Sequence, residues 1–350
     1  VVHSGFADTE SRYRQRYADL AVNPDVREVF AIRARVISAL RRRLDEVGFI
    51  EVETPILQPL YGGAFARPFT THHNALDRQL YLRIADELYL KRLIVGSLDR
   101  VYEFGKNFRN EGIDRTHNPE FTMLELYQAF ADYETMMELT ERLVSETALE
   151  VIGSHQVEWD GHSVDLSPPW ARITFFDALE RHAGIDARSA STGELVNRLA
   201  EAGREDVEQQ SRTKLLDVMF SEWVEPELVN PTIVYDYPIE MSPLAKPKRG
   251  DPGLAERFEV IVAGTELANA FSELNDPVDQ WNRFTEQARA RAAGDAEAQG
   301  LDDDYVQALE YGLPPTGGMG MGIDRLVMLL TGKTTIREVI LYPVLREGDG

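Results

Sequence analysis

The segments of this chain that have strand patterns come in pairs, and long helical segments separate the pairs. One pair is Val101 to Arg109 with Phe121 to Phe130, and another is Phe258 to Ala263 with Leu267 to Leu274. Neither pair encloses a helix, whereas regular βαβ units place a helix between successive parallel strands. This order predicts a mixed α+β fold, with an antiparallel sheet flanked by helices.

The first long helix is well marked at both ends. Asn23 can cap it, Pro24 suits its first turn, and Gly48 can end it. Apolar residues recur between these ends at helical spacing, namely Val29, Ile32, Val36, Ile37, Leu40 and Leu44. The polar, basic stretch before Asn23 is expected to be a linker. Residues 1–22 are therefore predicted as linker or start of the core, and 23–350 as one domain.

Further elements are expected along that domain. Alternation ending in a proline predicts a short strand in Phe49 to Pro55. Residues 173–229 are mostly helical in pattern and strongly acidic, and we expect them to form a small helical insertion. A strand, Gly317 to Gly322, is expected to run into a helix from Asp324. Other helices are predicted at Glu87 to Ser97, Met136 to Val151, Val278 to Ala293 and Asp304 to Tyr311.

Composition limits the classes of function. The 350 residues are 43% hydrophobic, which is enough to bury a sizeable core, and they include no cysteine. Thiolate nucleophiles, disulfides and cysteine zinc sites are excluded. No stretch approaches the roughly 20 apolar residues of a membrane helix, and no signal peptide is visible. The net charge of −22 argues against a generally basic nucleic-acid binder, although a local basic surface can still bind phosphates.

Arg109 and Phe121 are the first candidate functional residues. Arg109 closes one strand of the first pair, where a guanidinium can hold a phosphate or carboxylate in a bidentate pair. A structural ion pair with Glu111 explains Arg109 equally well. Phe121 opens the second strand, where it can belong to the core or stack on a base.

Several glutamates lie in or beside strands, where acidic residues are uncommon. Glu125 shares a strand face with Tyr127, and Glu87 lies near the start of a helix. Three more lie in or beside the second strand pair: Glu259, Glu266 and Glu273. Buried carboxylates need a cationic partner, which could be Mg²⁺, arginine or an ammonium ligand. Solvated strand faces are the alternative.

The glycine run Gly317 to Gly322 is a weak signal alone. It suits a strand that another group approaches closely, and it is not a dinucleotide fingerprint. Arg325 follows at the start of a helix, where anions are favoured.

Three segments in this order resemble signature motifs 1, 2 and 3 of the class II aminoacyl-tRNA synthetases. They are the helix ending at Gly48 with the strand to Pro55, Phe108 to Phe121, and Gly317 to Leu330. Each motif alone is degenerate, whereas the three together are specific and span nearly the whole chain. The resemblance implies the fold of that class, with motif 1 at a homodimer interface.

Four further segments are similar to the lysyl-tRNA synthetases of subclass IIb. They are Gly62 to Asn74, Leu82 to Arg92, His117 to Tyr127, and Ala268 to Asp276. This similarity implies activation of L-lysine by ATP and its transfer to tRNA(Lys). It also implies a cytoplasmic enzyme with Mg²⁺ and no membrane partner. Residue 1 falls about where the linker after an anticodon-binding OB domain would begin, so that domain is expected to be absent here.

The resemblance also implies roles for individual residues. Glu87, Glu273 and Tyr127 would hold the lysine ε-ammonium, Phe271 its aliphatic stem, and Gly63, Glu125 and Asn269 the rest of the amino acid. Arg109 and Arg325 would be the catalytic arginines, on the α- and γ-phosphates. Phe121 and Arg325 would sandwich adenine, Glu111 and His117 would hold other parts of ATP, and Glu259 and Glu266 would bind Mg²⁺.

One departure and three alternatives accompany this interpretation. Many relatives have arginine directly before the loop histidine, whereas Thr116 stands here and Arg115 precedes it. The alternatives are a paralogue that lysylates a protein such as elongation factor P, a non-catalytic synthetase-like binding module, and an aspartyl or asparaginyl enzyme. The binding module is disfavoured by four intact residues, namely Arg109, Glu259, Glu266 and Arg325. Glu87 and Glu273 argue against an anionic or amide substrate.

Overall fold

An eight-stranded sheet forms the centre of the molecule. The computed structural model describes residues 8–205, 207, 210–292 and 300–346. The strand order is β1-β5-β6-β15-β14-β13-β10-β9. Neighbours are antiparallel except for the outer pairs β1–β5 and β10–β9, which are parallel. The bounds are β1 Ile50–Glu51, β5 Arg100–Phe108, β6 Glu120–Ala129, β15 Thr316–Gly322, β14 Thr265–Ser272, β13 Arg257–Val262, β10 Thr232–Tyr235 and β9 Ala171–Thr174.

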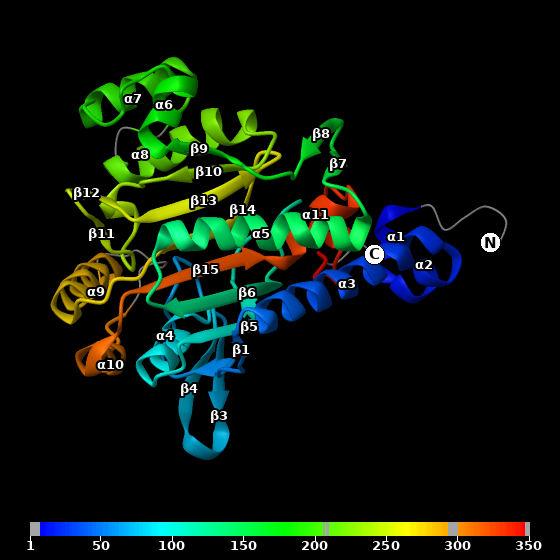
Figure 1. Cartoon of the computed structure of the whole chain (residues 1–350), viewed down its shortest axis with the longest axis horizontal. Helices are drawn as coiled ribbons and strands as arrows, with labels where there is room; N and C mark the ends of the chain where they lie inside the picture. Colours follow the sequence, from blue (N-terminus) through cyan, green and yellow to red (C-terminus); the bar gives the residue numbers. More distant parts are fainter. Residues whose placement is uncertain (1–7, 206, 208–209, 293–299, 347–350) are drawn as a thin grey trace.

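Three helices cover one face of this sheet and form the main core with it (Figure 1). They are α3 (Pro24–Glu46), α5 (Tyr133–Ile152) and α11 (Ile323–Thr331). The helix α5 is capped by the Asp132 side chain and ends at Gly153, which adopts the left-handed conformation at φ 74°. Buried side chains from all three helices pack against alternate residues of β6, β13, β14 and β15.

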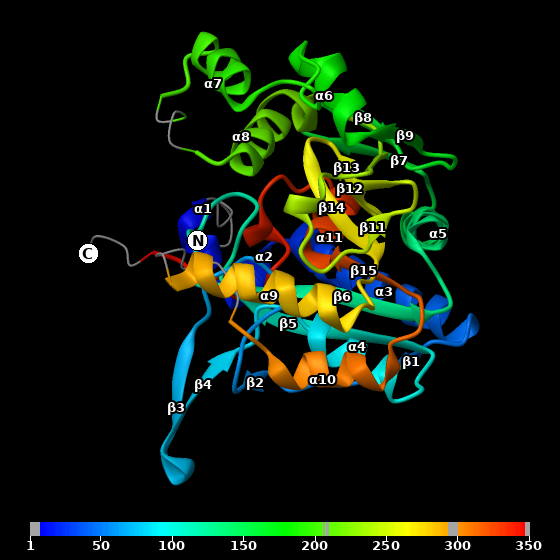
Figure 2. The same cartoon turned by 90° about the vertical axis from the view of Figure 1, so that its left-hand side faces the viewer.

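The other face of the sheet stays accessible near its middle. Beside it lie α4 (Glu87–Val95), α9 (Pro277–Ala292) and α10 (Asp303–Gly312), which share a smaller core. Figure 2 shows α9 and α10 running side by side along this part of the molecule. The helices α6 (Phe175–Ala183), α7 (Thr192–Glu201) and α8 (Arg212–Met219) gather at the β9 edge around a core of their own.

The sequence predicted most of these elements correctly. The antiparallel α+β sheet, the two strand pairs, the first helix and the helices of segment 173–229 are confirmed. The first residues of that segment belong to β9 instead. The expected helix end at Ala293 lies outside the described residues.

The segment before Asn23, expected to be a linker or the start of the core, is helical in the structure. It forms α1 (Thr9–Arg14) and α2 (Arg16–Val22). Arg16 is buried there, where it pairs with Asp19 at 2.7 Å and donates to the carbonyl oxygens of Leu341 and Arg337. A basic residue that looks solvent-facing in sequence therefore anchors the N-terminal helices to the C-terminal segment.

Three small sheets were not predicted from the sequence. They are β2-β4-β3, β7-β8 and β11-β12. The hairpin of β3 (Thr70–His73) and β4 (Arg78–Leu82) projects from the body in both cartoon views (Figures 1 and 2). The remaining strands are β2 Leu57–Gln58, β7 Gln156–Trp159, β8 His162–Asp165, β11 Pro247–Lys248 and β12 Asp251–Ala255.

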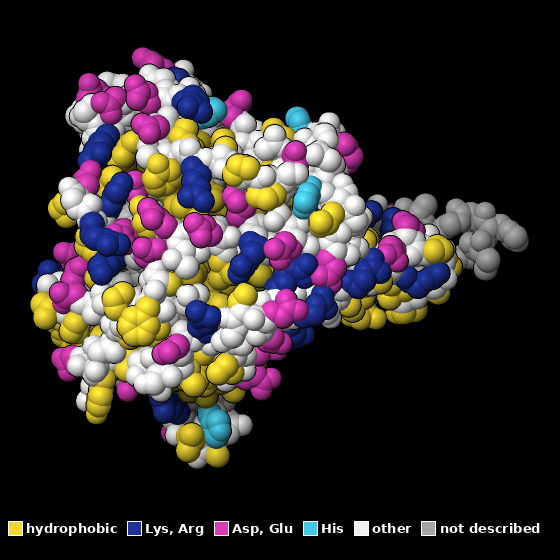
Figure 3. All heavy atoms as spheres, in the orientation of Figure 1, with side chains coloured by type: hydrophobic (Ala, Val, Ile, Leu, Met, Phe, Trp, Pro, Cys, Tyr) yellow, Lys and Arg dark blue, Asp and Glu magenta, His cyan; other side chains and the backbone are white. Residues whose placement is uncertain are grey.

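Charged side chains of both signs are distributed over the surface (Figure 3). On the face drawn in Figure 3, acidic and basic side chains are interspersed among apolar ones. None of the described helices is both long and apolar enough to cross a membrane.

Candidate active site

The site face of the sheet is set by strand alternation. On β6, Leu124 and Leu126 point to the main core, so Glu125 and Tyr127 point to the opposite face. The same alternation sends Asn269 and Phe271 of β14 to the site face, because Ala268 and Ala270 belong to the core.

The strand register assembles these residues into two rows across the sheet. One row runs Glu259, Asn269, Gly320, Glu125. The row beside it runs Arg257, Phe271, Gly318, Tyr127. A glycine of β15 thus lies at the middle of each row, between side chains of β14 and β6. The glycine strand therefore forms the floor of a hollow whose walls are polar.

Gly318 has no side chain, and any other residue at this position would collide with Glu273 and Tyr127. A Cβ at this position would lie 2.0 Å from Glu273 Oε1 and 2.5 Å from a Tyr127 ring carbon. At Gly320, the nearest atom to such a Cβ is the flexible end of Met123, at 3.3 Å. The close approach expected of this strand is confirmed, and Gly318 is where it is tightest.

The deepest end of the hollow holds two buried carboxylates. Glu87 begins α4 and Glu273 follows β14. Both pair with the buried ammonium of Lys91, whose Nζ lies 2.5 Å from Glu87 Oε1. Burial raises the pKa of Glu273, and the Lys91 ammonium opposes that shift. Among the described residues, Glu273 Oε1 has no hydrogen-bond partner. A buried, unpartnered carboxylate oxygen needs a donor, and a cationic ligand would supply one.

Glu125 is a third buried carboxyl on the same face. Its Oε2 accepts a hydrogen bond from Tyr127 Oη at 3.1 Å, and its Oε1 accepts one from the Asp86 amide at 3.1 Å. Burial, followed by repulsion from Glu87, raises the pKa of Glu125 to about 7. An ammonium group beside it would favour the ionised form.

Arg109 supplies a cation without a carboxylate of its own. Its guanidinium lies 5.1 Å from the centre of the Phe121 ring, and Nε contacts the Ile84 carbonyl oxygen at 3.4 Å. It forms no ion pair with any described residue, so the structural pair with Glu111 is excluded among them. Burial lowers its pKa, against the attraction of Glu266 and Glu111. Such a guanidinium is ready to receive an anion.

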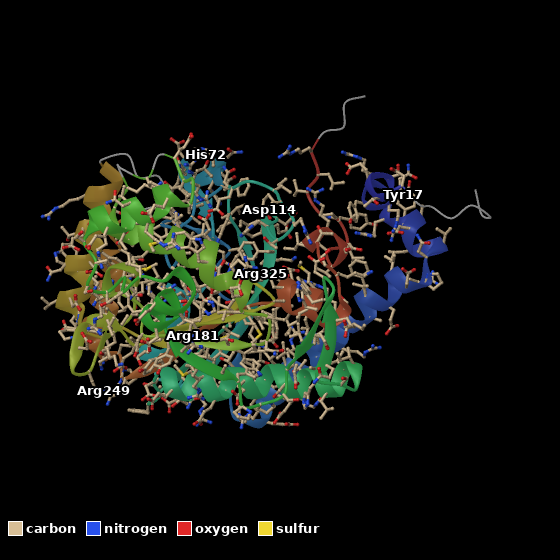
Figure 4. All side chains as sticks on the ribbon, turned by 90° about the horizontal axis from the view of Figure 1, so that it is seen from above. Tyr17, His72, Asp114, Arg181, Arg249 and Arg325 are labelled. Carbon is tan, nitrogen blue, oxygen red and sulfur yellow. The ribbon has the colours of Figure 1, made fainter. Side chains whose placement is uncertain are left out.

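Arg325 and the loop between β5 and β6 form the outer end. Arg325 Nη1 donates to the Glu266 carbonyl oxygen at 2.6 Å, and Nη2 lies 3.3 Å from His117 Nε2. His117 Nδ1 lies 2.8 Å from Asp114 Oδ2 and 3.1 Å from Thr116 Oγ1. Figure 4 shows Arg325 and Asp114 on the side of the sheet away from α5. Thr116 therefore helps to orient the histidine.

The backbone next to Arg325 is fixed by contacts of its neighbour Asp324. The carboxylate of Asp324 accepts the Thr122 amide at 2.7 Å and pairs with Arg33 at 2.6 Å. These contacts fix the start of α11 against β6 and α3. The guanidinium of Arg325 is thereby presented to the hollow.

Glu259 and Glu266 are the candidate metal ligands of the site. Glu259 is held by Arg257 at 2.6 Å and by Tyr237 Oη at 2.8 Å, and burial raises its pKa to about 7. Electrostatic repulsion from Glu266 contributes to that rise in the pKa of Glu259, so the two carboxylates interact directly. The described residues contain no group of three metal-ligating side chains. Mg²⁺ bound with a nucleotide needs only one or two carboxylates besides phosphate oxygens, so the pair fits it.

The structure brings every predicted site residue to one cavity of about 530 Å³. They are Gly63, Glu87, Arg109, Glu111, His117, Phe121, Glu125, Tyr127, Glu259, Glu266, Asn269, Phe271, Glu273 and Arg325. Three participants were missed, namely Lys91, Arg257 and Tyr237. The spacing of Glu87 and Lys91, four residues apart on one helix, was the available signal for the first.

Comparison with known proteins identifies the family. The model for tRNA synthetases class II (D, K and N) matches residues 8–346. The chain is 56% identical over 343 residues to a lysine–tRNA ligase of Syntrophomonas wolfei, covering 98% of this chain and 70% of that protein. It is 57% identical to lysine–tRNA ligases of Chloroflexus aurantiacus and a Roseiflexus species, which it covers to 70% and 71%. The chain therefore belongs to the tRNA synthetases class II (D, K and N).

Proposed function

We infer that the chain is a lysine–tRNA ligase, which activates L-lysine with ATP and transfers it to the 3′ end of tRNA(Lys). The observation that carries this is the closed end of the cavity, where Glu87 and Glu273 are buried and Glu273 Oε1 has no partner among the described residues. A site with carboxylates buried this way discriminates for a cationic side chain. The lysine–tRNA ligases that the chain resembles support the same substrate.

We propose that the lysine side chain extends toward Glu87 and Glu273. The ε-ammonium would pair with these carboxylates, with Tyr127 beside it. The Phe271 ring would pack on the aliphatic stem. Gly63, Glu125 and Asn269 would position the α-amino and carboxylate end, because they line the same cavity as Arg109 and the two glutamates.

We propose that ATP occupies the outer half of the cavity. Phe121 and Arg325 would enclose adenine, and Arg109 would hold the α-phosphate together with the lysine carboxylate. Arg325 would also face the γ-phosphate, and Glu111 and His117 would contact other parts of ATP. The pairing of His117 with Asp114 and Thr116 supports its orientation toward Arg325.

Mg²⁺ is the proposed cofactor, held by Glu259 and Glu266. When bound, it would neutralise phosphate charge. Arg257 and Tyr237 hold Glu259 in place, so its carboxylate is oriented by residues of this chain.

The chemistry requires no general base. The lysine carboxylate is already ionised and attacks the α-phosphorus, which yields lysyl-adenylate and pyrophosphate. A terminal hydroxyl of tRNA then attacks the carbonyl carbon of the mixed anhydride, which forms the lysyl ester of tRNA and releases AMP and the hydroxyl proton. Catalysis rests on positioning by the lysine site and on charge stabilisation by Arg109 and Arg325.

The test is ATP–pyrophosphate exchange with each amino acid, without tRNA. Lysine-dependent exchange is expected. Exchange with β-lysine in place of lysine would point to the paralogue that modifies a protein such as elongation factor P. Absence of exchange with every amino acid would favour a synthetase-like binding module. Transfer to tRNA(Lys), measured next, separates tRNA from a protein acceptor.

A homodimer is also proposed, through motif 1. The sheet ends at β1, where Ile50 is exposed, and Ile56, Leu57 and Leu60 close by are exposed as well. An apolar sheet edge of this kind is a common protein interface. Light scattering at micromolar concentration is expected to give the mass of a dimer, and a monomer mass would contradict this. The cytoplasm is proposed as the compartment because the substrate tRNA is charged there.

Gly318→Ala is expected to raise the KM for lysine by about 100-fold, because the added Cβ would displace Glu273 and Tyr127 together. The KM for ATP should change much less. Gly320→Ala is the matched control, since its Cβ would come close only to the flexible end of Met123, at 3.3 Å, and would lie at an ordinary contact distance of 3.8 Å from Glu125 Cγ. Equal effects of the two substitutions on the KM for lysine would contradict the account of the cavity floor.

A further inference from the structure

Lys91 is a buried cation at the closed end of the cavity whose role the proposed reaction leaves open. It lies on α4, one turn after Glu87, and its side chain is completely buried. Its ammonium pairs with Glu87 and Glu273 and lies 5.4 Å from the centre of the Phe271 ring. These are the groups proposed to hold the side chain of the substrate.

In both Glu87 and Glu273, one carboxylate oxygen contacts Lys91 and the other lies toward the cavity. Lys91 contacts Oε1 of Glu87 and Oε2 of Glu273. The other oxygen of Glu87 lies 3.7 Å from the position of a Cβ at Gly63, and that of Glu273 lies 2.0 Å from one at Gly318. Both glycines line the cavity. Each glutamate therefore presents one oxygen to the resident ammonium and one toward the space of the ligand.

The charge balance at this end depends on Lys91. Among the described residues, it is the only cation within 4 Å of Glu87 or Glu273. Arg257 acts on Glu87 from farther away. The other titratable groups that act on Lys91 or on these carboxyls are Tyr305 of α10 and Glu125 and Tyr127 of β6. Two carboxyls this close would share a proton without a cation between them.

A purely structural role explains Lys91 poorly. The ion pair removes a lysine and two glutamates from water, and burying charges in this way is seldom stabilising compared with an apolar residue of similar size. The neighbouring helix positions Leu88, Leu90 and Ile94 are buried and apolar. Apolar residues at all three positions, 87, 91 and 273, would fill the same volume without that cost.

We propose that Lys91 is a positioning residue that serves as a resident ammonium. It holds Glu87 and Glu273 as anions, with one oxygen of each directed to the substrate. The ε-ammonium of lysine then completes a cluster of two carboxylates and two ammonium groups. This inference rests on the proposed lysine activation, and it deepens that function by explaining how the site is kept ready for a cation.

Lys91→Met is the first test, by ATP–pyrophosphate exchange over a range of pH. We expect the KM for lysine to rise roughly 30-fold near pH 7, with the KM for ATP changed less than about threefold. Without Lys91 the carboxyl pair retains a proton that lysine must displace. The increase should therefore shrink as the pH rises through the pKa of the pair. A pH-independent increase would overturn the proposal, as would an unchanged KM for lysine.

A matched control and a rescue separate charge from folding. Arg92→Met removes the next cation on α4, which pairs with Asp302 and Asp304 and does not line the cavity. It should leave the KM for lysine unchanged. In Lys91→Ala the missing atoms correspond to propylammonium, so added propylammonium should lower the KM for lysine whereas sodium should not. No rescue by propylammonium would contradict the resident-ammonium role.

A measurement on the unmodified protein keeps the proposal testable even where the variants do not fold. Calorimetric titration with lysine near pH 8, in two buffers of different ionisation enthalpy, reports protons released on binding. If Lys91 already holds Glu87 and Glu273 as anions, binding of one lysine should release fewer than about 0.3 protons. A carboxyl pair that is protonated before binding should release about one proton, and that result would overturn the proposal. Unmodified protein without lysine-dependent exchange would instead refute the proposed function itself.

Discussion

Glu273→Gln is expected to lower kcat/KM for lysine in pyrophosphate exchange by about 10²- to 10³-fold. The amide keeps the size of the side chain but loses the charge that faces both Lys91 and the proposed ε-ammonium. The ammonium of lysine would then enter a pocket that has one carboxylate fewer and is still desolvated. Most of the loss should appear in the KM for lysine, because the altered contact forms at the ammonium end and not at the reacting carboxylate.

Glu256→Gln is the matched control for that prediction. Glu256 is also a buried glutamate, but it pairs with Arg249 at 3.2 Å and does not line the cavity. The same change of charge at this position should leave the KM for lysine within about twofold of its value in the unmodified protein. The reason is that Glu256 shares no interaction partner with the lysine site. Equal losses from both substitutions would show that Glu273 acts through the fold and not on the substrate.

Arg109→Met is expected to reduce kcat of exchange by about 10³-fold. The guanidinium lies beside Phe121 and has no ion-pair partner among the described residues, so its charge is available to the phosphate. Methionine would keep contact with the aromatic ring but would leave the negative charge that develops at the α-phosphorus uncompensated. Single-turnover formation of lysyl-adenylate measures this step directly.

Arg100→Met provides the comparison for Arg109. Arg100 begins β5, whereas Arg109 follows its last residue, so both removals affect the same strand. Arg100 contacts the Val47 carbonyl oxygen at the opposite end and does not line the cavity. Its loss should leave kcat unchanged. A fall in kcat of similar size in both variants would argue that Arg109 only stabilises the strand.

Local sequence patterns were enough to predict most elements of the fold. Alternation over Val101 to Arg109 and over Phe121 to Phe130 predicted two paired strands, and the structure pairs them. The helix from Pro24 was marked by Pro24, by Gly48 after its end and by apolar spacing, although the Asn23 side chain makes no capping hydrogen bond. Such features depend on residues a few positions apart, and they therefore remain readable without knowledge of distant contacts.

Charged residues were the least predictable from sequence. Arg16 lay in a stretch expected to be a linker, and the structure buries it against carbonyl oxygens more than 300 residues away. Arg33 lies on the polar side of its helix, yet it pairs with Asp324 under the site. A long polar side chain looks the same in sequence whether its partner is water or a distant carboxylate.

The sequence by itself determined which side chains share a strand face and which three segments resemble the synthetase motifs. Only the tertiary structure decided that Gly318 lies between Phe271 and Tyr127, because the register of a sheet comes from pairing of distant strands. Only it placed Lys91 between Glu87 and Glu273. An ion pair at the end of a cavity requires that a helix and a strand far apart in the chain meet, and packing of the whole core brings them together.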